Sequence, residues 1–184
     1  MSGPRLLSRS FSLPLVCALA VAGCYQDRPL GVSSIEPDGA LAAAAPARPF
    51  RLTAEGHANP DFSLGPCNVV NTELGTGVAQ HLGRVTWQAT EVADFCVDPA
   101  NPGLAAVSGQ LVVTAANGDQ LTASGQSTVH ADFAKDTLTI TGTFTITGGT
   151  GRFAGATGGG TVTGGGSLLP PFAVATVFEG RIAY

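Results

Sequence analysis

A regular alternation of apolar and hydroxylated residues constrains the fold of this chain more than any other feature. Within residues 137–147, threonines take alternate positions, and between them lie Leu138, Ile140, Phe144 and Ile146. Residues two apart point to the same face of a strand, so this segment has one apolar and one hydroxylated face. Such a strand packs on a core with one side and meets water with the other, as in antiparallel sheets.

The same pattern recurs along the last two thirds of the chain. It predicts further strands over residues 50–56, 78–82, 85–92, 111–115, 160–164 and 172–182. Asn117-Gly118 separates two alternating runs, which is a strong hairpin signal, and we expect a type I′ turn with positive φ at both residues. Including the strand that resumes at Leu121, the pattern gives about eight strands in a meander.

A meander must protect its edge strands, and closure into a barrel removes the edges altogether. The 25 glycines permit bends and bulges at barrel corners. Helix formers are scarce in the glycine- and threonine-rich second half, which also favours strands. We therefore predict an all-β domain over residues 50–184, an antiparallel β-barrel of about eight strands, with a β-sandwich as the alternative.

The first 23 residues have the layout of a secretory signal peptide. Arg5 and Arg9 precede an apolar run of about a dozen residues, which is shorter than the roughly 20 that a spanning helix needs. The run ends in Val21-Ala22-Gly23-Cys24, which resembles the lipobox of bacterial lipoproteins. The resemblance implies that Cys24 is lipidated and anchors the mature protein to a membrane of the cell envelope. An ordinary signal peptide, yielding a secreted or periplasmic soluble protein, is the alternative.

Residues 24–49 are rich in proline and alanine and lack alternation, so we expect a flexible tether. The formal net charge is −4, and loss of residues 1–23 makes the mature chain more acidic. No cluster of Lys or Arg is present, which disfavours nucleic-acid binding and electrostatic docking on anionic lipid. Membrane attachment therefore depends on Cys24.

Two cysteines fall within the predicted domain, Cys67 and Cys96. In an oxidising exported compartment such a pair usually forms a disulfide. A metal pair or a redox pair is the alternative, but the wide separation and the absence of a nearby Cys or His disfavour both.

The segment Gly148-Gly149-Thr150-Gly151-Arg152-Phe153 resembles the Gly-Gly-Thr-Gly turn of dirigent proteins and allene oxide cyclases. Together with segments 81–84, 115–119 and 179–182 it resembles a group of uncharacterised exported bacterial proteins. The resemblance implies an eight-stranded antiparallel barrel. Plant members bind hydrophobic substrates inside it, but their substrate-contacting residues match no position here, so no catalytic residue is carried over.

No arrangement of residues specifies a reaction, a cofactor or a metal site. We interpret the acidic pairs Asp94/Asp98 and Asp132/Asp136 as solvent-exposed turn residues rather than catalytic carboxylates. His81 and Trp87 are separated by an even number of positions, so they have the same parity along a strand. If that parity holds through Gly83, both side chains face the barrel interior and can contact a small apolar ligand. The favoured alternative is that both are packed core residues.

These observations favour a non-enzymatic, lipid-anchored β-barrel of the cell envelope with a structural or small-ligand-binding role. The alternative is an allene-oxide-cyclase-like or dirigent-like barrel enzyme that acts on a small hydrophobic molecule.

Overall fold

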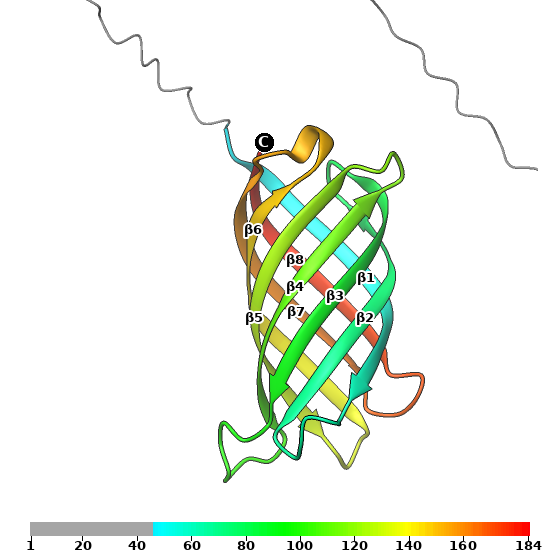
Figure 1. The fold of residues 1–184 in the computed structure, drawn as a ribbon, viewed down its shortest axis with the longest axis vertical. Coiled ribbons are helices and arrows are strands. Elements are labelled where there is room, and N and C mark those ends of the chain that lie inside the picture. Colours follow the sequence, from blue (N-terminus) through cyan, green and yellow to red (C-terminus); the bar gives the residue numbers. More distant parts are fainter. Residues whose placement is uncertain (1–45) are drawn as a thin grey trace, which may run out of the picture. The chain divides into compact units, whose positions relative to one another are not determined.

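The computed structural model describes residues 46–184, and these form a closed antiparallel β-barrel (Figure 1). The strands follow one another around the barrel as β1 (Arg48–Asp61), β2 (Asn68–Ala79), β3 (Gly83–Asp94), β4 (Leu104–Ala115), β5 (Gln120–Asp132), β6 (Thr137–Gly149), β7 (Thr157–Ser167) and β8 (Ala173–Ala183), with one 3₁₀ turn, η1 (Gly151–Phe153), between β6 and β7. Strand β1 pairs with both β2 and β8, which closes the barrel. The predicted barrel is confirmed, and the β-sandwich alternative is wrong.

The predictions for the N-terminal part of the chain lie almost wholly outside the described residues. These are the signal peptide, the lipidated Cys24 and most of the tether. Strand β1 begins at Arg48, so the last two residues assigned to the tether belong to the barrel wall. Within residues 46–184, no helix has the length and apolar character needed to cross a bilayer.

The strands are longer than the alternation predicted, and β2 differs most. The sequence indicated a strand over residues 78–82, whereas β2 ends at Ala79 and residues 80–82 form a turn. Its inward-facing positions include Gly75 and Gly77 in place of apolar side chains, while Leu74 and Val78 are exposed on the outer face. The apolar period that marks a half-buried strand is therefore missing here.

The hairpin predicted at Asn117-Gly118 is present between β4 and β5, but its turn is not type I′. Gly118 has a positive φ of 88° and Asn117 does not. The Gly118 amide donates to the Ala115 carbonyl (2.9 Å), and the Ala115 amide donates to the Asp119 carbonyl (2.9 Å). Only one residue therefore needs the left-handed conformation, and glycine occupies it.

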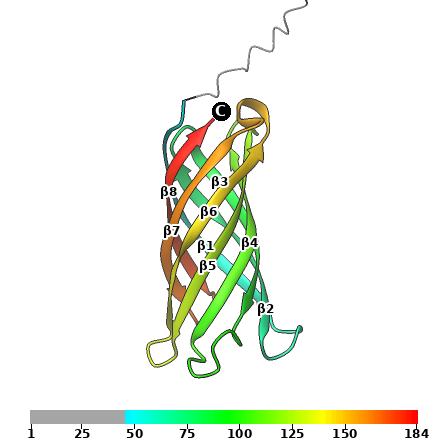
Figure 2. The same ribbon diagram turned by 90° about the vertical axis from the view of Figure 1, so that its left-hand side faces the viewer.

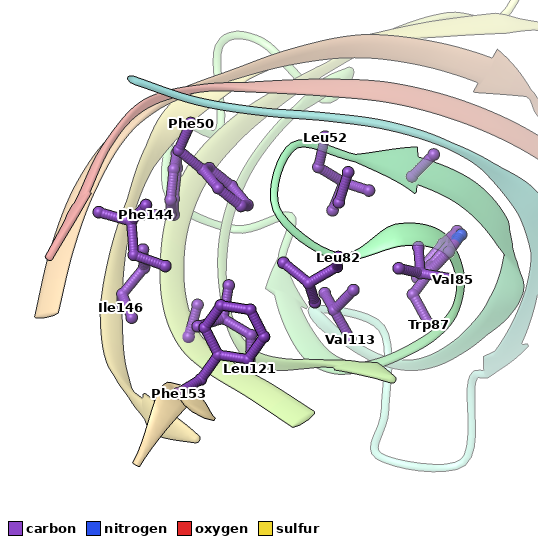
Figure 3. Close-up of a cluster of buried hydrophobic side chains, with 14 of the residues drawn as sticks. Phe50, Leu52, Leu82, Val85, Trp87, Val113, Leu121, Phe144, Ile146 and Phe153 are labelled. Atoms are coloured by element: carbon purple, nitrogen blue, oxygen red, sulfur yellow. The ribbon is translucent and has the colours of Figure 1, made fainter. Parts of the chain in front are cut away.

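One end of the barrel is filled by side chains. This sealed end holds the C-terminus and η1, and the loops β1–β2, β3–β4, β5–β6 and β7–β8 lie at the opposite end (Figures 1 and 2). Figure 3 shows the filling cluster, which includes Phe50, Leu52, Leu82, Val85, Val113, Leu121, Ile146 and Phe153. The side chain of Phe153 is 0% exposed, so η1 acts as a plug.

The Gly-Gly-Thr-Gly-Arg-Phe turn holds this plug in place. The Gln120 amide donates to the Thr150 hydroxyl (2.9 Å), and the Thr150 amide donates to the Gln120 carbonyl (2.8 Å). Arg152 forms an ion pair with Asp119 (3.5 Å). The motif therefore docks η1 on the β4–β5 hairpin, which gives it a structural role.

At the loop end, Cys67 and Cys96 form the predicted disulfide, with their Cα atoms 5.1 Å apart. It joins the β1–β2 loop to the β3–β4 loop. Next to it, the Phe95 amide donates to the Cys67 carbonyl (2.8 Å). The two loops are therefore fixed to each other at the end of the barrel that side chains leave unfilled.

Candidate ligand-binding cavity

The half of the barrel nearest the loops contains a cavity of about 430 Å³. Inward-facing residues from all eight strands line it, and most are apolar, among them Ala89, Val107, Leu111, Val129, Ile140, Val162 and Val174. Its volume lies within the roughly 300–1,000 Å³ typical of small-molecule sites. It is nearly three times the roughly 150 Å³ of an engineered apolar cavity that holds benzene.

Trp87 forms part of the boundary between the cavity and the sealed end. Its side chain is 5% exposed, belongs to the filling cluster and also lines the cavity. The indole Nε1 donates to the carbonyls of Glu55 (3.3 Å) and Thr76 (3.2 Å). A Cβ added at Gly75 would lie 2.7 Å from Nε1, so the glycine in β2 makes room for the ring.

Phenylalanines from all four loops surround the entrance of the cavity. Phe62 lies in β1–β2, Phe95 in β3–β4, Phe133 in β5–β6 and Phe172 in β7–β8, and each of them lines the cavity. Phe62 is 66% exposed and Phe133 is 63% exposed. The entrance therefore presents an apolar rim to a molecule that approaches from solvent.

Two glutamates, Glu73 on β2 and Glu91 on β3, place carboxyl groups in the cavity wall. In the β2–β3 ladder Glu73 is opposite Ala89, and Glu91 is opposite Asn71. The two glutamates are thus diagonal neighbours, a relation that usually separates Cα atoms by about 7–8 Å. The side chain of Glu91 packs against Gly109. A Cβ added at Gly109 would lie 2.6 Å from the Cγ atom of Glu91.

The apolar wall makes both carboxyl groups harder to ionise. Desolvation, with a further contribution from the charge of Glu91, raises the pKa of Glu73 from 4.5 to about 7. Desolvation also raises the pKa of Glu91. Neither carboxyl group forms a salt bridge or a side-chain hydrogen bond within residues 46–184. The cavity therefore contains two acidic groups that a ligand can contact.

The structure separates the two residues that the sequence suggested for ligand binding. Trp87 lines the cavity, but His81 does not. His81 lies in the β2–β3 turn with a φ of 70°, where its Nε2 is 2.9 Å from the Pro49 carbonyl oxygen and its ring meets that of Tyr184 edge-on at 5.8 Å. The turn at residues 80–82 interrupts the alternation that would have carried the parity of Trp87 to His81.

The sequence reasoning missed Glu73 and Glu91, although their parity could have revealed them. Glu91 lies on the same face of β3 as Trp87, Ala89 and Ala93, which are all buried. A carboxyl group at an inward position of a strand is unusual, because burying a charge without a partner is costly. An acidic residue at an inward-facing position of a strand therefore indicates a candidate binding residue.

No group of three or more His, Cys, Asp and Glu residues within 46–184 is placed to hold a metal ion. The cavity can instead surround an apolar molecule and offer it two carboxyl groups, which accept hydrogen bonds when ionised and attract a positive charge. No protein-family model matches the chain, and no curated protein matches it.

Proposed function

We propose that this chain is an exported, lipid-anchored binding protein that holds one small, largely apolar molecule in the unfilled half of its barrel. The apolar cavity of about 430 Å³ carries the proposal. Barrels of about eight strands either fill their interior with side chains or hold one small ligand. Here the sealed end is filled and the loop end is hollow, an arrangement suited to binding.

Substitution of Gly125 by Phe is expected to abolish this binding. Gly125 lines the cavity, and a Cβ added there meets only the Thr143 carbonyl oxygen, at 3.6 Å. The new side chain can therefore enter the cavity without displacing the backbone. With the neutral fluorophore N-phenyl-1-naphthylamine as probe, we expect the wild type to enhance its emission and Gly125→Phe to lower the affinity at least tenfold.

A control on the same strand separates cavity filling from added aromatic surface. His130 is exposed on β5 and does not line the cavity, so His130→Phe should bind the fluorophore like the wild type. Circular dichroism checks that both variants keep the barrel. Equal affinity in folded Gly125→Phe and wild type would refute binding inside the barrel.

The membrane anchor is proposed from the lipobox resemblance at Cys24. A single acyl chain gives only marginal membrane binding, whereas two chains anchor stably, and a diacylglyceryl cysteine carries two. We expect mass spectrometry of the mature N-terminus to find a lipid-modified Cys24. The Cys24→Ala variant should leave the membrane fraction, and an unmodified, soluble wild type would refute the anchor.

A barrel enzyme is the second candidate, and the pKa of Glu73 near 7 favours it, because a group poised near neutral pH suits acid–base catalysis. An acid–base reaction also needs a reacting atom within reach of that carboxyl group. Recovering the bound molecule unchanged after incubation supports the binding protein. Recovering it altered supports the enzyme.

A further inference from the structure

We propose that the ligand is a cationic amphiphile, a lipophilic amine whose ammonium group sits between Glu73 and Glu91 while its hydrocarbon chain fills the apolar cavity. This inference rests on the proposed binding function and specifies the chemistry of the ligand. It stands on the composition of the cavity wall, the distribution of charge along the barrel and the rings at the entrance.

Among residues 46–184, the side chains that line the cavity include acidic groups and no positively charged group. Glu73, Glu91 and Asp136, in the β5–β6 turn, are the titratable residues that line the cavity, and no Lys, Arg or His within residues 46–184 does so. Two carboxylates in an apolar wall are costly unless they have a positively charged partner. An ammonium group supplies three hydrogen-bond donors and a positive charge, so it satisfies both carboxyl groups together.

Charge is also distributed unevenly between the two ends of the barrel. The five described arginines lie toward the sealed end, at Arg48, Arg51, Arg84, Arg152 and Arg181. The loop end carries Asp61, Asp94, Asp98, Asp132 and Asp136, and its one cation within residues 46–184, Lys135, pairs with Asp132 at 2.6 Å. A cleft lined by one sign of charge concentrates ligands of the opposite sign. The entrance therefore attracts a cation and repels a carboxylate such as a fatty acid.

The rim of the cavity suits both halves of such a molecule. A hydrocarbon chain packs against Phe62, Phe133 and the other loop phenylalanines, and the faces of these rings also attract an ammonium group. Beyond the rim, the apolar wall surrounds the chain. A bare inorganic cation would leave this apolar surface unused, and the wall lacks the density of oxygen ligands that Ca²⁺ requires.

Three molecules with the same ten-carbon chain separate the possible head groups: decylamine, 1-decanol and decanoate. Their binding is followed at pH 8 by the fluorescence of Trp87, the one tryptophan of the chain, and by isothermal titration calorimetry. We expect decylamine to bind at least tenfold more tightly than 1-decanol, and decanoate to bind most weakly. Binding of 1-decanol as tight as that of decylamine would overturn the inference.

Substitutions of the two glutamates test whether they recognise the ammonium group. Glu73→Gln and Glu91→Gln keep the shape of the wall and remove one charge each, so the preference for decylamine should fall at least tenfold in the double variant while 1-decanol binds unchanged. Glu55→Gln, at an exposed position of β1, is the matched control and should keep the preference. An unchanged preference in the double variant would refute the assigned site.

Acidification provides an independent readout. Lowering the pH from 8 to 5 protonates Glu73, whose pKa of about 7 reflects its burial and the neighbouring Glu91, so decylamine should bind several-fold more weakly and 1-decanol equally well. The failure of all three molecules to bind would count against the proposed function itself. Binding of all three with equal affinity would preserve that function and reject the cationic ligand.

Discussion

Substitution of Phe153 by Ala is expected to lower the free energy of unfolding by about 3–5 kcal/mol, the usual cost of removing a buried phenylalanine. Phe153 is 0% exposed and its ring centroid lies 4.8 Å from that of Tyr184. Its removal leaves a void in the plug that closes the sealed end. Urea denaturation should show a lower midpoint with an unchanged slope.

The matched control for this variant is Phe133→Ala at the opposite end of the barrel. Phe133 is 63% exposed, so its truncation should change the free energy of unfolding by less than about 0.5 kcal/mol. Near-equal stability of the two variants would show that η1 does not seal the barrel. The same measurement on Phe133→Ala also shows whether the rim matters for folding.

The second large effect is a gain of stability. At pH 8 we expect Glu73→Gln to be more stable than the wild type by about 2–3 kcal/mol, since each pKa unit is worth about 1.4 kcal/mol and the water that enters the cavity reduces the full value. In the folded protein burial and Glu91 raise the pKa of Glu73 from 4.5 to about 7. Folding therefore forces an ionised carboxylate into an apolar wall at high pH.

The sign of the pH dependence follows from proton binding. Between pH 4.5 and 7 the folded state holds more protons at Glu73 than the unfolded state does, so stability falls as the pH rises through this window. The advantage of Glu73→Gln should therefore vanish below pH 4.5. A constant difference across the window, or none at pH 8, would contradict the raised pKa. Glu55→Gln, which removes a carboxyl group from an exposed position of β1, is the matched control.

The fold could be predicted because apolar and polar residues alternate strictly in several strands. Residues 137–147 show it most clearly: Phe144 and Ile146 are buried, and the threonines at the alternate positions of this segment are exposed. Strand β2 could not be delimited in this way, because Gly75 and Gly77 occupy inward positions. Gly75 leaves space for the indole of Trp87 and the backbone of β1, and Gly77 leaves space for β1 alone, so both choices depend on neighbouring strands.

The candidate site was only partly predictable for a related reason. Parity placed Trp87 inside the barrel, and the same parity carried across the turn misplaced His81. Glu73 and Glu91 lie on different strands and become a pair only through the register of β2 with β3. The rim is harder still to foresee, since Phe62 and Phe172 are brought to one entrance by loops more than a hundred positions apart.

Closure of the barrel by β1 and β8 has a consequence for the order of folding. Arg48 lies opposite Ile182 and His57 opposite Ala173, so the first strand finds its second partner only when the last strand is present. Until then β1 exposes an unpaired edge, which is an aggregation hazard. Contacts of such long sequence separation also slow folding. The barrel can therefore close only after β8 has been synthesised and is free to pair with β1.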